Sequence, residues 1–471
     1  MIMKWPFNIK SILCLLWVVF YSHASAYELT LNQNRITIHA DQVKLHVLMN
    51  DLAKKTDIKV YIDPDLNPDI SAHFENHDLQ RGLESILNPL NHVLKWESAP
   101  TSSGTRVRLT AIHIFKSGNT DTITPPGKTS NLDIARNPED GSLYVQGEIL
   151  IRLKPDIDPE QVNKILKQLG GTLISENRTL GIYRIKVSDQ AKIPALVRQI
   201  KGLPGIETAE PNYAYPIALP HRYVPDTETT PQLDFNPPAE GAVPIAVLDS
   251  GLAPGAMPDG QLLASQDALN PDAIISDTLG HGTQMALIAA GAVTPFGVTK
   301  TNDSNNPVIA IRAFDDNGFT SSVALMNGIK FALANGARVM SLSWGSPTPS
   351  NFINDTLEYS ASKGLIIVAS AGNEPTGKPV YPAAYASVIG IGALAPSGRN
   401  WKNTNYGDFV DVYLPGFADM PVGYKADPGI YAGTSISAAF AANQTAAFLS
   451  KNPQAGKKEI LEFMRSSLGH L

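Results

Sequence analysis

GHGTQMA, residues 280–286, holds the one internal histidine of the second half of the chain. Between Gly241 and Leu471 the histidines are His281 and the penultimate residue, His470. Three further motifs lie on small-residue turns: Val247-Leu248-Asp249-Ser250-Gly251, Ala371-Gly372-Asn373 and Gly433-Thr434-Ser435. In chain order the four motifs supply a carboxylate, an imidazole, an amide donor and a hydroxyl. These are the groups that nucleophilic catalysis by a serine needs.

Apolar runs alternate with helical segments around these motifs. Residues 244–248 (PIAVL) are uninterrupted and apolar, as in a buried parallel strand, and Asp249 stands at the carboxyl end, where catalytic groups collect in open α/β sheets. Similar runs cover 307–313, 338–342, 365–370 and 388–393, with helical segments at 281–291, 322–335, 351–363 and 435–450. This alternation predicts a three-layer α/β domain with a parallel sheet.

The order of the motifs separates two arrangements of the same chemistry. An α/β-hydrolase runs Ser, Asp, His and places its serine in a Gly-x-Ser-x-Gly turn. Here Ser435 is followed by Ile436 and Ser437, so that turn is absent. The order Asp, His, Ser is that of the subtilisin arrangement.

With these motifs, residues 241–450 resemble a subtilase. The resemblance implies that Asp249 orients His281, that His281 is the base and then the acid, and that Ser435 attacks the substrate. It also implies that Asn373 stabilises the oxyanion. Two segments, 341–345 and 316–320, resemble the edges that flank bound substrate. The substrate-binding residues implied there are Ser343, Trp344, Gly345, Gly318 and Phe319.

The first 26 residues have the pattern of a secretory signal peptide. Lys4 and Lys10 precede the apolar stretch 12–21, and Ala24-Ser25-Ala26 gives the small-x-small cleavage pattern. We therefore expect export to a periplasmic or extracellular location. A membrane anchor is the alternative, although the apolar stretch is short for a span of about 20 residues. The single cysteine, Cys14, lies inside this segment, so a processed chain would hold no disulfide.

Residues 27–115 read as a small α+β module. Strand-like alternation at 36–38 and 58–62 and helical stripes over 43–52 and 79–87 are followed by strands at 93–96 and 107–115. The stretch 36–96, with its LAKKTD pattern, resembles the short N-terminal domain of secretins and TonB-dependent transducers, which implies an envelope protein as partner. A generic α+β prodomain is the alternative. Residues 116–139 are polar and are predicted to be a linker.

Residues 140–216 predict a second small α+β domain of the order β-α-β-β-α-β. Its ending, Glu210-Pro211-Asn212-Tyr213, resembles that of subtilase propeptides, which implies a ferredoxin-like domain that inhibits its own protease. Residues 217–240 contain prolines without periodicity and are predicted to be a linker. We expect self-cleavage between Ala214 and Leu233, and the peptidase domain to cover residues 241–471.

Charge and composition exclude several other classes. The net charge of −6 offers no basic face for nucleic acid. No later apolar run reaches the roughly 18 residues of a membrane span. No cofactor is required and no metal site is predicted. The acidic residues in 303–306 and 315–318 make calcium possible but do not match a spaced calcium loop, so calcium is not indicated and solvated turns are favoured.

These observations together predict an exported serine endopeptidase that acts on polypeptides and is made as a self-inhibited precursor. Two alternatives stay open. One is an envelope scaffold protein with a little-used protease fold, and the other is an esterase or peptide ligase that uses the same three residues.

Overall fold

A computed structural model describes residues 27–468 except 33–34, 57, 63–65, 88–89, 102–103, 116–131, 156, 158, 189–191, 224–232, 259, 299–304 and 423–427. The expected signal peptide and Cys14 lie outside the described residues, as does most of the expected linker 116–139. The chain forms two compact units, Met1–Thr124 and Pro125–Leu471. Over the described part of the chain, no helix is both long and apolar enough to span a bilayer.

The first unit, the N-terminal module, contains two three-stranded sheets. Their orders are β1-β2-β4 and β3-β6-β5, which is more strand than the sequence predicted. The elements are β1 (Tyr27–Asn32), β2 (Arg35–Lys44), α1 (Leu45–Lys55), β3 (Lys59–Ile62), β4 (Asp69–Asp78), α2 (Leu79–Leu87), β5 (Asn91–Thr101) and β6 (Gly104–Phe115). The expected helical stripe was misplaced at its start: Val43 belongs to β2 and Val47 is exposed, whereas Leu45, Leu48 and Met49 are buried.

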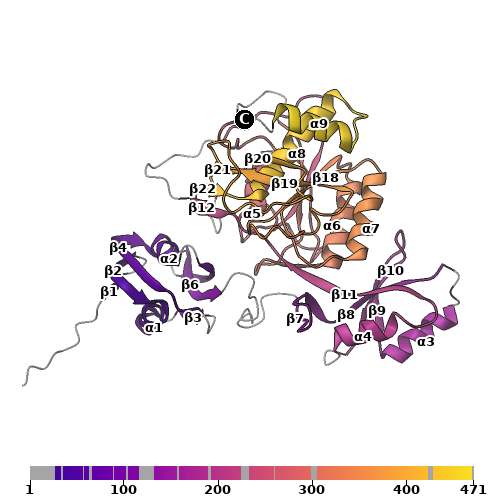
Figure 1. Ribbon diagram of the computed structural model, residues 1–471, viewed down its shortest axis with the longest axis horizontal. Helices are drawn as coiled ribbons and strands as arrows, with labels where there is room; N and C mark the ends of the chain where they lie inside the picture. The colour runs from indigo at the N-terminus through magenta and orange to yellow at the C-terminus, as the bar shows by residue number, and fades with distance from the viewer. Residues whose placement is uncertain are drawn as a thin grey trace, which may run out of the picture. The chain divides into compact units, whose positions relative to one another are not determined.

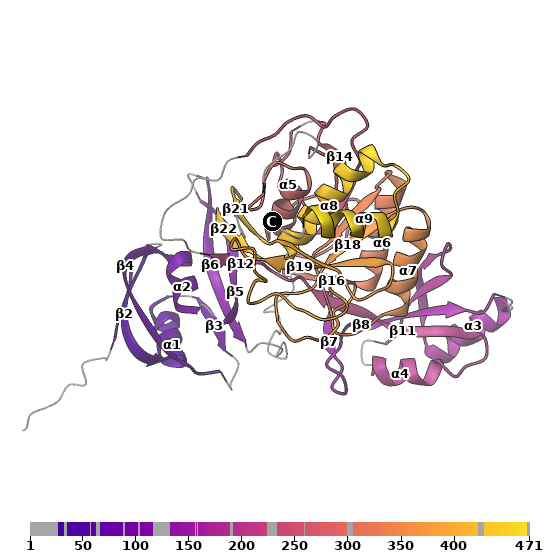
Figure 2. The same cartoon turned by 45° about the horizontal axis from the view of Figure 1, so that its top comes forward.

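The second unit begins with a propeptide-like domain, residues 134–216. Its elements are β7 (Ile134–Arg136), β8 (Leu143–Leu153), α3 (Pro159–Leu169), β9 (Thr172–Asn177), β10 (Ile182–Lys186), α4 (Ile193–Ile200) and β11 (Ile206–Pro216). Helices α3 and α4 lie on one side of the sheet (Figure 2). Strand β7 pairs with β8, so the sheet starts before the expected boundary at residue 140.

Strand β8 separates two cores because successive side chains point to opposite faces of a strand. Ile149, Ile151 and Leu153 pack with α3 and α4. Leu150 points the other way and joins a core with residues of the C-terminal domain. The propeptide-like domain therefore uses its second sheet face to bind the rest of the unit.

The C-terminal domain is built on a seven-stranded sheet of order β14-β15-β13-β17-β18-β19-β20, in which every neighbouring pair is parallel. Its strands are β13 (Ile245–Asp249), β14 (Leu262–Asp267), β15 (Val308–Arg312), β17 (Val339–Leu342), β18 (Ile366–Ser370), β19 (Val388–Leu394) and β20 (Val412–Pro415). Its helices are α5 (His281–Ala289), α6 (Ser322–Ala334), α7 (Asn351–Ser362), α8 (Thr434–Lys451) and α9 (Lys457–Ser467).

Alternation along β13 creates the layers. Ile245 and Val247 pack in the core that includes α5, α8 and α9, whereas Ala246 and Leu248 pack in the core that includes α6 and α7. Helices α6 and α7 lie next to each other on their face of the sheet (Figure 1). The expected three-layer α/β fold is confirmed, and the strands that the sequence did not predict, β14 and β20, are the two edges.

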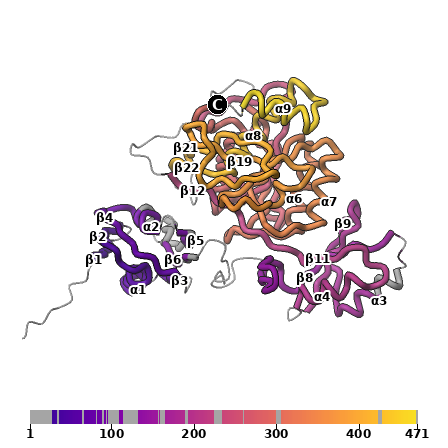
Figure 3. Tube along the Cα trace, in the orientation of Figure 1, coloured from indigo at the N-terminus to yellow at the C-terminus, as the bar shows by residue number. Residues whose placement is uncertain are grey.

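Strand β11 joins the two domains of the second unit. It pairs antiparallel with β8, and its last residues, Ala214 to Pro216, pair antiparallel with β16 (Phe319–Ser321) of the C-terminal domain. The trace in Figure 3 follows it from one domain into the other. Residues 217–240 were expected to be an irregular linker, but they contain a strand. Strand β12 (His221–Tyr223) pairs with β22 (Gly429–Ala432), which in turn pairs with β21 (Phe417–Met420).

Two side chains on one face of β11 cap two helices. Glu210 accepts hydrogen bonds from Ser350 Oγ (2.7 Å) and from Asn351 N (2.8 Å) at the start of α7. Asn212 Oδ1 accepts from Val323 N (3.3 Å) at the start of α6. Helix starts leave backbone N–H groups without partners, so these contacts satisfy donors that would otherwise be buried unpaired. Burial raises the pKa of Glu210, which these hydrogen bonds partly oppose.

We expect Glu210→Ala to weaken the attachment of the propeptide-like domain to α7. The loss should be about 1–3 kcal/mol, because a buried hydroxyl and a partly buried backbone amide lose their acceptor. Hydrogen exchange of the full chain should show faster exchange at Asn351. Glu207→Ala is the matched control, since Glu207 lies on the same strand and is more exposed, 3.8 Å from Arg152. Equal exchange in both variants would contradict the capping role.

Candidate active site

Asp249 and His281 meet in a buried contact between a strand end and a helix start. Asp249 is the last residue of β13 and His281 the first of α5. His281 Nδ1 lies 2.6 Å from Asp249 Oδ1, and both residues are at most 1 % exposed. The second carboxylate contact, from Ser250 N at 2.7 Å, also reaches Oδ1. A carboxylate held at Nδ1 fixes the imidazole with Nε2 free to exchange a proton.

The start of α5 lies directly against the loop that follows Asp249. A Cβ on Gly282 would come within 2.4 Å of Gly251 O, and a Cβ on Gly251 within 1.9 Å of Ser276 O. These two glycines therefore allow a backbone contact that no other residue would permit. They set the spacing at which the strand end and the helix start meet.

Asp277 is a supporting residue that the sequence did not single out. Its carboxylate accepts from Gly280 N (2.8 Å), Thr283 N (2.8 Å), Thr283 Oγ1 (2.7 Å) and Ser250 Oγ (2.9 Å). Ser250 Oγ in turn accepts from Gly282 N (2.8 Å). Asp277 thus ties the helix that carries His281 to the loop that carries Asp249. An acidic residue shortly before a helix start is the local signal that could have marked it.

Ser435 and Asn373 form a second group of expected site residues, linked to each other through Thr434. Ser435 lies in the first turn of α8, and Asn373 follows β18. Asn373 Oδ1 accepts from Thr434 N and Thr434 Oγ1, both at 2.9 Å, and Thr434 Oγ1 accepts from Gly372 N at 3.2 Å. These bonds aim the amide nitrogen of Asn373 outward as a donor. Thr434, which the sequence marked only as part of the Gly-Thr-Ser motif, orients the Asn373 side chain.

The serine and the histidine are not joined by a hydrogen bond. His281 Nε2 is buried and has no hydrogen-bond partner among the described residues. Ser435 Oγ instead donates to the carbonyl of Ala218 at 3.3 Å, and Asn373 Nδ2 donates to the carbonyl of Leu219 at 3.1 Å. The chain's own segment therefore holds both groups. Such catalytic contacts are often long until a substrate is in position.

The two expected substrate edges lie on either side of this segment. Ile217 N donates to Gly318 O at 2.8 Å, next to β16, and Ile217 pairs with Trp344 in an antiparallel bridge. Phe319 is buried and pairs with Pro216, while Tyr215 packs on Trp344 with ring centroids 5.0 Å apart. Ser343 is buried beside this bridge, and a Cβ on Gly345 would lie 2.3 Å from Val380 Cγ1. An extended peptide thus lies between both edges.

Acidic residues near the site are engaged in structural contacts. Asp315 is buried, and its Oδ1 accepts from Asn317 N (3.0 Å) and Phe319 N (2.9 Å), so it shapes the turn into β16. The expectation that Asp315 lies in a solvated turn is therefore wrong. Asp316 accepts from Arg312 Nη2 at 2.8 Å. Within the described ranges, no group of three or more His, Cys, Asp or Glu side chains could hold a metal ion.

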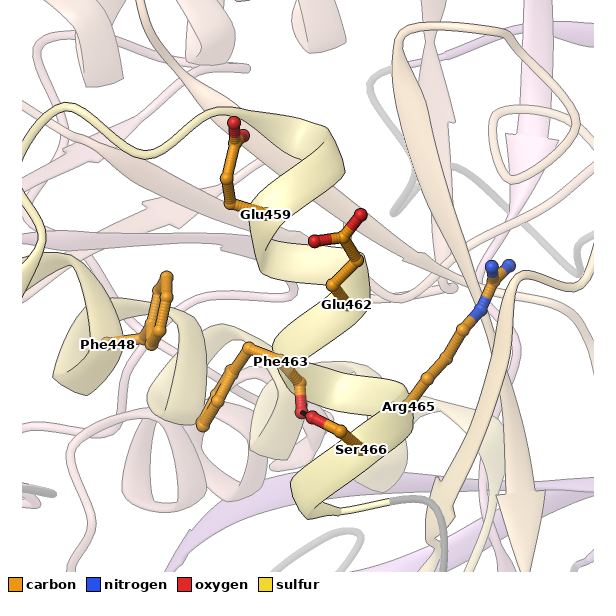
Figure 4. A pocket seen from close by; sticks show the side chains of 6 residues that line it. All are labelled: Phe448, Glu459, Glu462, Phe463, Arg465 and Ser466. Carbon is orange, nitrogen blue, oxygen red and sulfur yellow. Dashed lines mark hydrogen bonds between the residues drawn. The ribbon is translucent and has the colours of Figure 1, made fainter.

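A shallow hollow lies elsewhere, between the C-terminal helices. It is lined by Phe448, Glu459, Glu462, Phe463, Arg465 and Ser466 (Figure 4). Phe448 of α8 and Phe463 of α9 stack there, with centroids 4.5 Å apart. None of the expected site residues lines it.

Comparison with known proteins yields two family matches. Residues 241–469 match the subtilase family, and residues 131–212 match the fervidolysin N-terminal prodomain. The second match starts before residue 140, in agreement with the place of β7 in the sheet. Both resemblances expected of this part of the chain are thereby confirmed. The resemblance of residues 27–115 to secretin domains stays a prediction.

Individual relatives agree with these matches. The thermophilic serine proteinase of Bacillus sp. (strain AK1) is 29 % identical over 315 residues, which are 64 % of this chain and 77 % of that protein. Thermitase of Thermoactinomyces vulgaris is 32 % identical over 182 residues, 38 % of this chain and 64 % of thermitase.

A solved structure gives the same result for the fold. The crystal structure of fervidolysin from Fervidobacterium pennivorans, described as a keratinolytic enzyme related to subtilisin, superposes with a TM-score of 0.56 at 22 % identity. The match covers 73 % of this chain and 60 % of that one. Residues 241–469 therefore form a domain of the subtilase family of serine endopeptidases, and a fervidolysin-like prodomain precedes it.

Proposed function

We propose that this protein is an exported endopeptidase in which Ser435 is the nucleophile, His281 the proton carrier, Asp249 its orienting carboxylate and Asn373 an oxyanion donor. We propose further that it is made as a precursor inhibited by its own propeptide-like domain. The observation that carries the proposal is the position of residues 217–219. They lie as an extended peptide between the substrate edges, with two successive carbonyls bonded to Ser435 and Asn373.

The chemistry proceeds in two halves. Ser435 Oγ would form a bond to the substrate carbonyl carbon while its proton moves to His281 Nε2, and the Asp249 carboxylate would stabilise the resulting imidazolium. The carbon–nitrogen bond then breaks as His281 returns the proton to the leaving nitrogen. Water repeats the sequence on the ester and releases the acid. For this, His281 Nε2 must accept the proton from Ser435 Oγ and donate it to the leaving nitrogen. Among the described residues no other group occupies Nε2.

The developing oxyanion needs fixed donors, because charge stabilised in advance costs no rearrangement during the reaction. Asn373 Nδ2 is one such donor, held by Thr434. Ser435 stands in the first turn of α8, where the positive end of the helix dipole favours negative charge.

Inhibition follows from the same contacts. A segment tethered to both domains has a millimolar-scale effective concentration at the site, so modest affinity is enough to fill it. Strand addition at Gly318 and Trp344 and helix capping by Glu210 and Asn212 hold it there. A polypeptide substrate has to displace this segment.

Two wider roles rest on the sequence alone. The pattern of residues 1–26 supports export, to the periplasm or outside the cell. The resemblance of residues 27–115 supports a contact between the N-terminal module and an envelope protein.

We expect Ser435→Ala to abolish both peptide hydrolysis and self-processing while leaving the fold intact. The full-length wild type should slowly release a fragment with a new N-terminus between residues 214 and 233, and the variant should not. Intact mass and N-terminal sequencing of both purified proteins measure this. If the variant still released this fragment when purified away from other proteins, the mechanism would be refuted. An uncleaved wild type would mean either that another protease activates the chain or that the scaffold alternative holds.

We expect the enzyme to prefer substrates that carry, before the cleaved bond, a side chain like that of the residue whose carbonyl faces Asn373. Leu219 takes that position, so the matured protein should hydrolyse Pro-Ile-Ala-Leu-p-nitroanilide, which copies residues 216–219. The matched peptide that ends in glutamate should react at least about tenfold more slowly in kcat/KM, about 1.4 kcal/mol, because an unpaired charge would be desolvated. Equal rates for the two peptides would show that the site does not discriminate between side chains at this substrate position.

A further inference from the structure

Residues 216–220, here called the propeptide segment, place one peptide bond at the site. This bond is Leu219–Pro220. Asn373 Nδ2 donates to the carbonyl oxygen of Leu219, so the bond on the far side of that carbonyl is the one positioned to break. The nitrogen of this bond belongs to a proline. Resting on the proposed function, we propose that Pro220 and the strand β12 behind it form a lock: the segment binds as a substrate but is cut only slowly, which keeps the full chain latent.

The leaving nitrogen is the first part of the lock. In acylation the bond from Ser435 Oγ to the Leu219 carbonyl carbon forms, the bond to the Pro220 nitrogen breaks, and the proton of Ser435 passes through His281 to that nitrogen. An ordinary amide nitrogen carries a hydrogen and can turn its developing lone pair toward the imidazole. The proline nitrogen carries a ring carbon in place of the hydrogen, and the ring fixes φ near −65°. Both restrict the geometry in which it can accept the proton.

On one side the Pro220 ring lies against Gly433, which limits how far it can turn. A Cβ built on Gly433 would lie 3.1 Å from Pro220 Cβ and 3.3 Å from Pro220 Cα. The ring thus occupies the space that a side chain at residue 433 would fill, two residues before the nucleophile. Reaction geometry tolerates little error, since a misplacement of about 1 Å can cost about a hundredfold in rate.

Strand β12 is the second part of the lock. His221, Arg222 and Tyr223 pair antiparallel with Ala432, Tyr431 and Ile430 of β22. The ring of His221 meets Trp401 edge to face at 5.2 Å, and that of Tyr223 meets Phe417 in the same way at 6.1 Å. Arg222 Nη2 also donates to Pro428 O at 3.3 Å.

These contacts hold the chain on the leaving side after a cut. The new secondary amine of Pro220 would stay beside the Leu219 ester of Ser435. It could attack the ester carbon, reform the amide and release the Ser435 oxygen, which takes back the proton through His281. A tethered amine has a high effective concentration, so this return competes with hydrolysis by water. The lock therefore slows the forward step and favours its reversal.

The test compares self-cleavage of full-length Pro220→Ala with that of the wild type. Mass spectrometry would follow the fragment that begins at residue 220. We expect it to appear at least about tenfold faster in the variant, which corresponds to a barrier lower by about 1.4 kcal/mol. Adding Ser435→Ala to the variant should stop the reaction and would show that the cut is the chain's own.

Pro216→Ala is the matched control. Pro216 lies in the same segment and pairs with Phe319, but its nitrogen does not follow the presented carbonyl. It should leave cleavage at residue 219 as slow as in the wild type. Equal acceleration by both substitutions would overturn the lock, because loosening of the strand would then explain the effect.

A fluorophosphonate that labels active serines separates failure of the lock from failure of the proposed function. If both chains label at Ser435 and Pro220→Ala is cut no faster at residue 219, the lock is wrong and the endopeptidase proposal stands. If neither chain labels, even with the propeptide segment displaced by mild urea, the proposed function fails and the lock fails with it.

Discussion

One strand, β11, is the constraint on which the second unit depends. It completes the sheet of the propeptide-like domain through β8, and its end adds to β16 of the C-terminal domain. Because β11 is hydrogen-bonded to a strand of each domain, the position of one domain fixes the path of the chain into the other. The segment that reaches Ser435 and Asn373 is therefore aimed by a sheet that lies in a different domain.

The four residues to which we assign the reaction could be singled out from the sequence because each stands at a local boundary. Asp249 ends an apolar strand, His281 and Ser435 stand at helix starts, and Asn373 follows a strand. In a parallel sheet the strand ends and the helix starts that follow them lie along one edge. Residues far apart in the chain can therefore be expected near one another from their local patterns alone. The structure brings them together in two pairs: His281 contacts Asp249, and Ser435 and Asn373 both bind the segment at residues 218–219.

What the sequence did not predict depends on contacts between distant segments. Asp277 and Thr434 act by orienting a neighbour: the place of Asp277 before a helix start marks it at most as a cap, and the partner that Thr434 orients lies 61 residues away in the chain. Strand β12 has no apolar alternation and exists because β22 offers its edge. Asp315 was expected in solvent because turns are usually polar, but the turn it shapes is covered by the propeptide segment.

The two-faced strand β8 has a consequence for how this protein can change in evolution. Ile149 and Ile151 face helices α3 and α4, whereas Glu148 and Leu150 face the other way, where Glu148 accepts from Asn212 Nδ2 at 2.7 Å. Deleting a single residue from β8 would exchange the two faces. Charged groups would enter one core and both domains would lose their fit at once. Variation in length is thus confined to the loops, and β8 can diverge only by substitution.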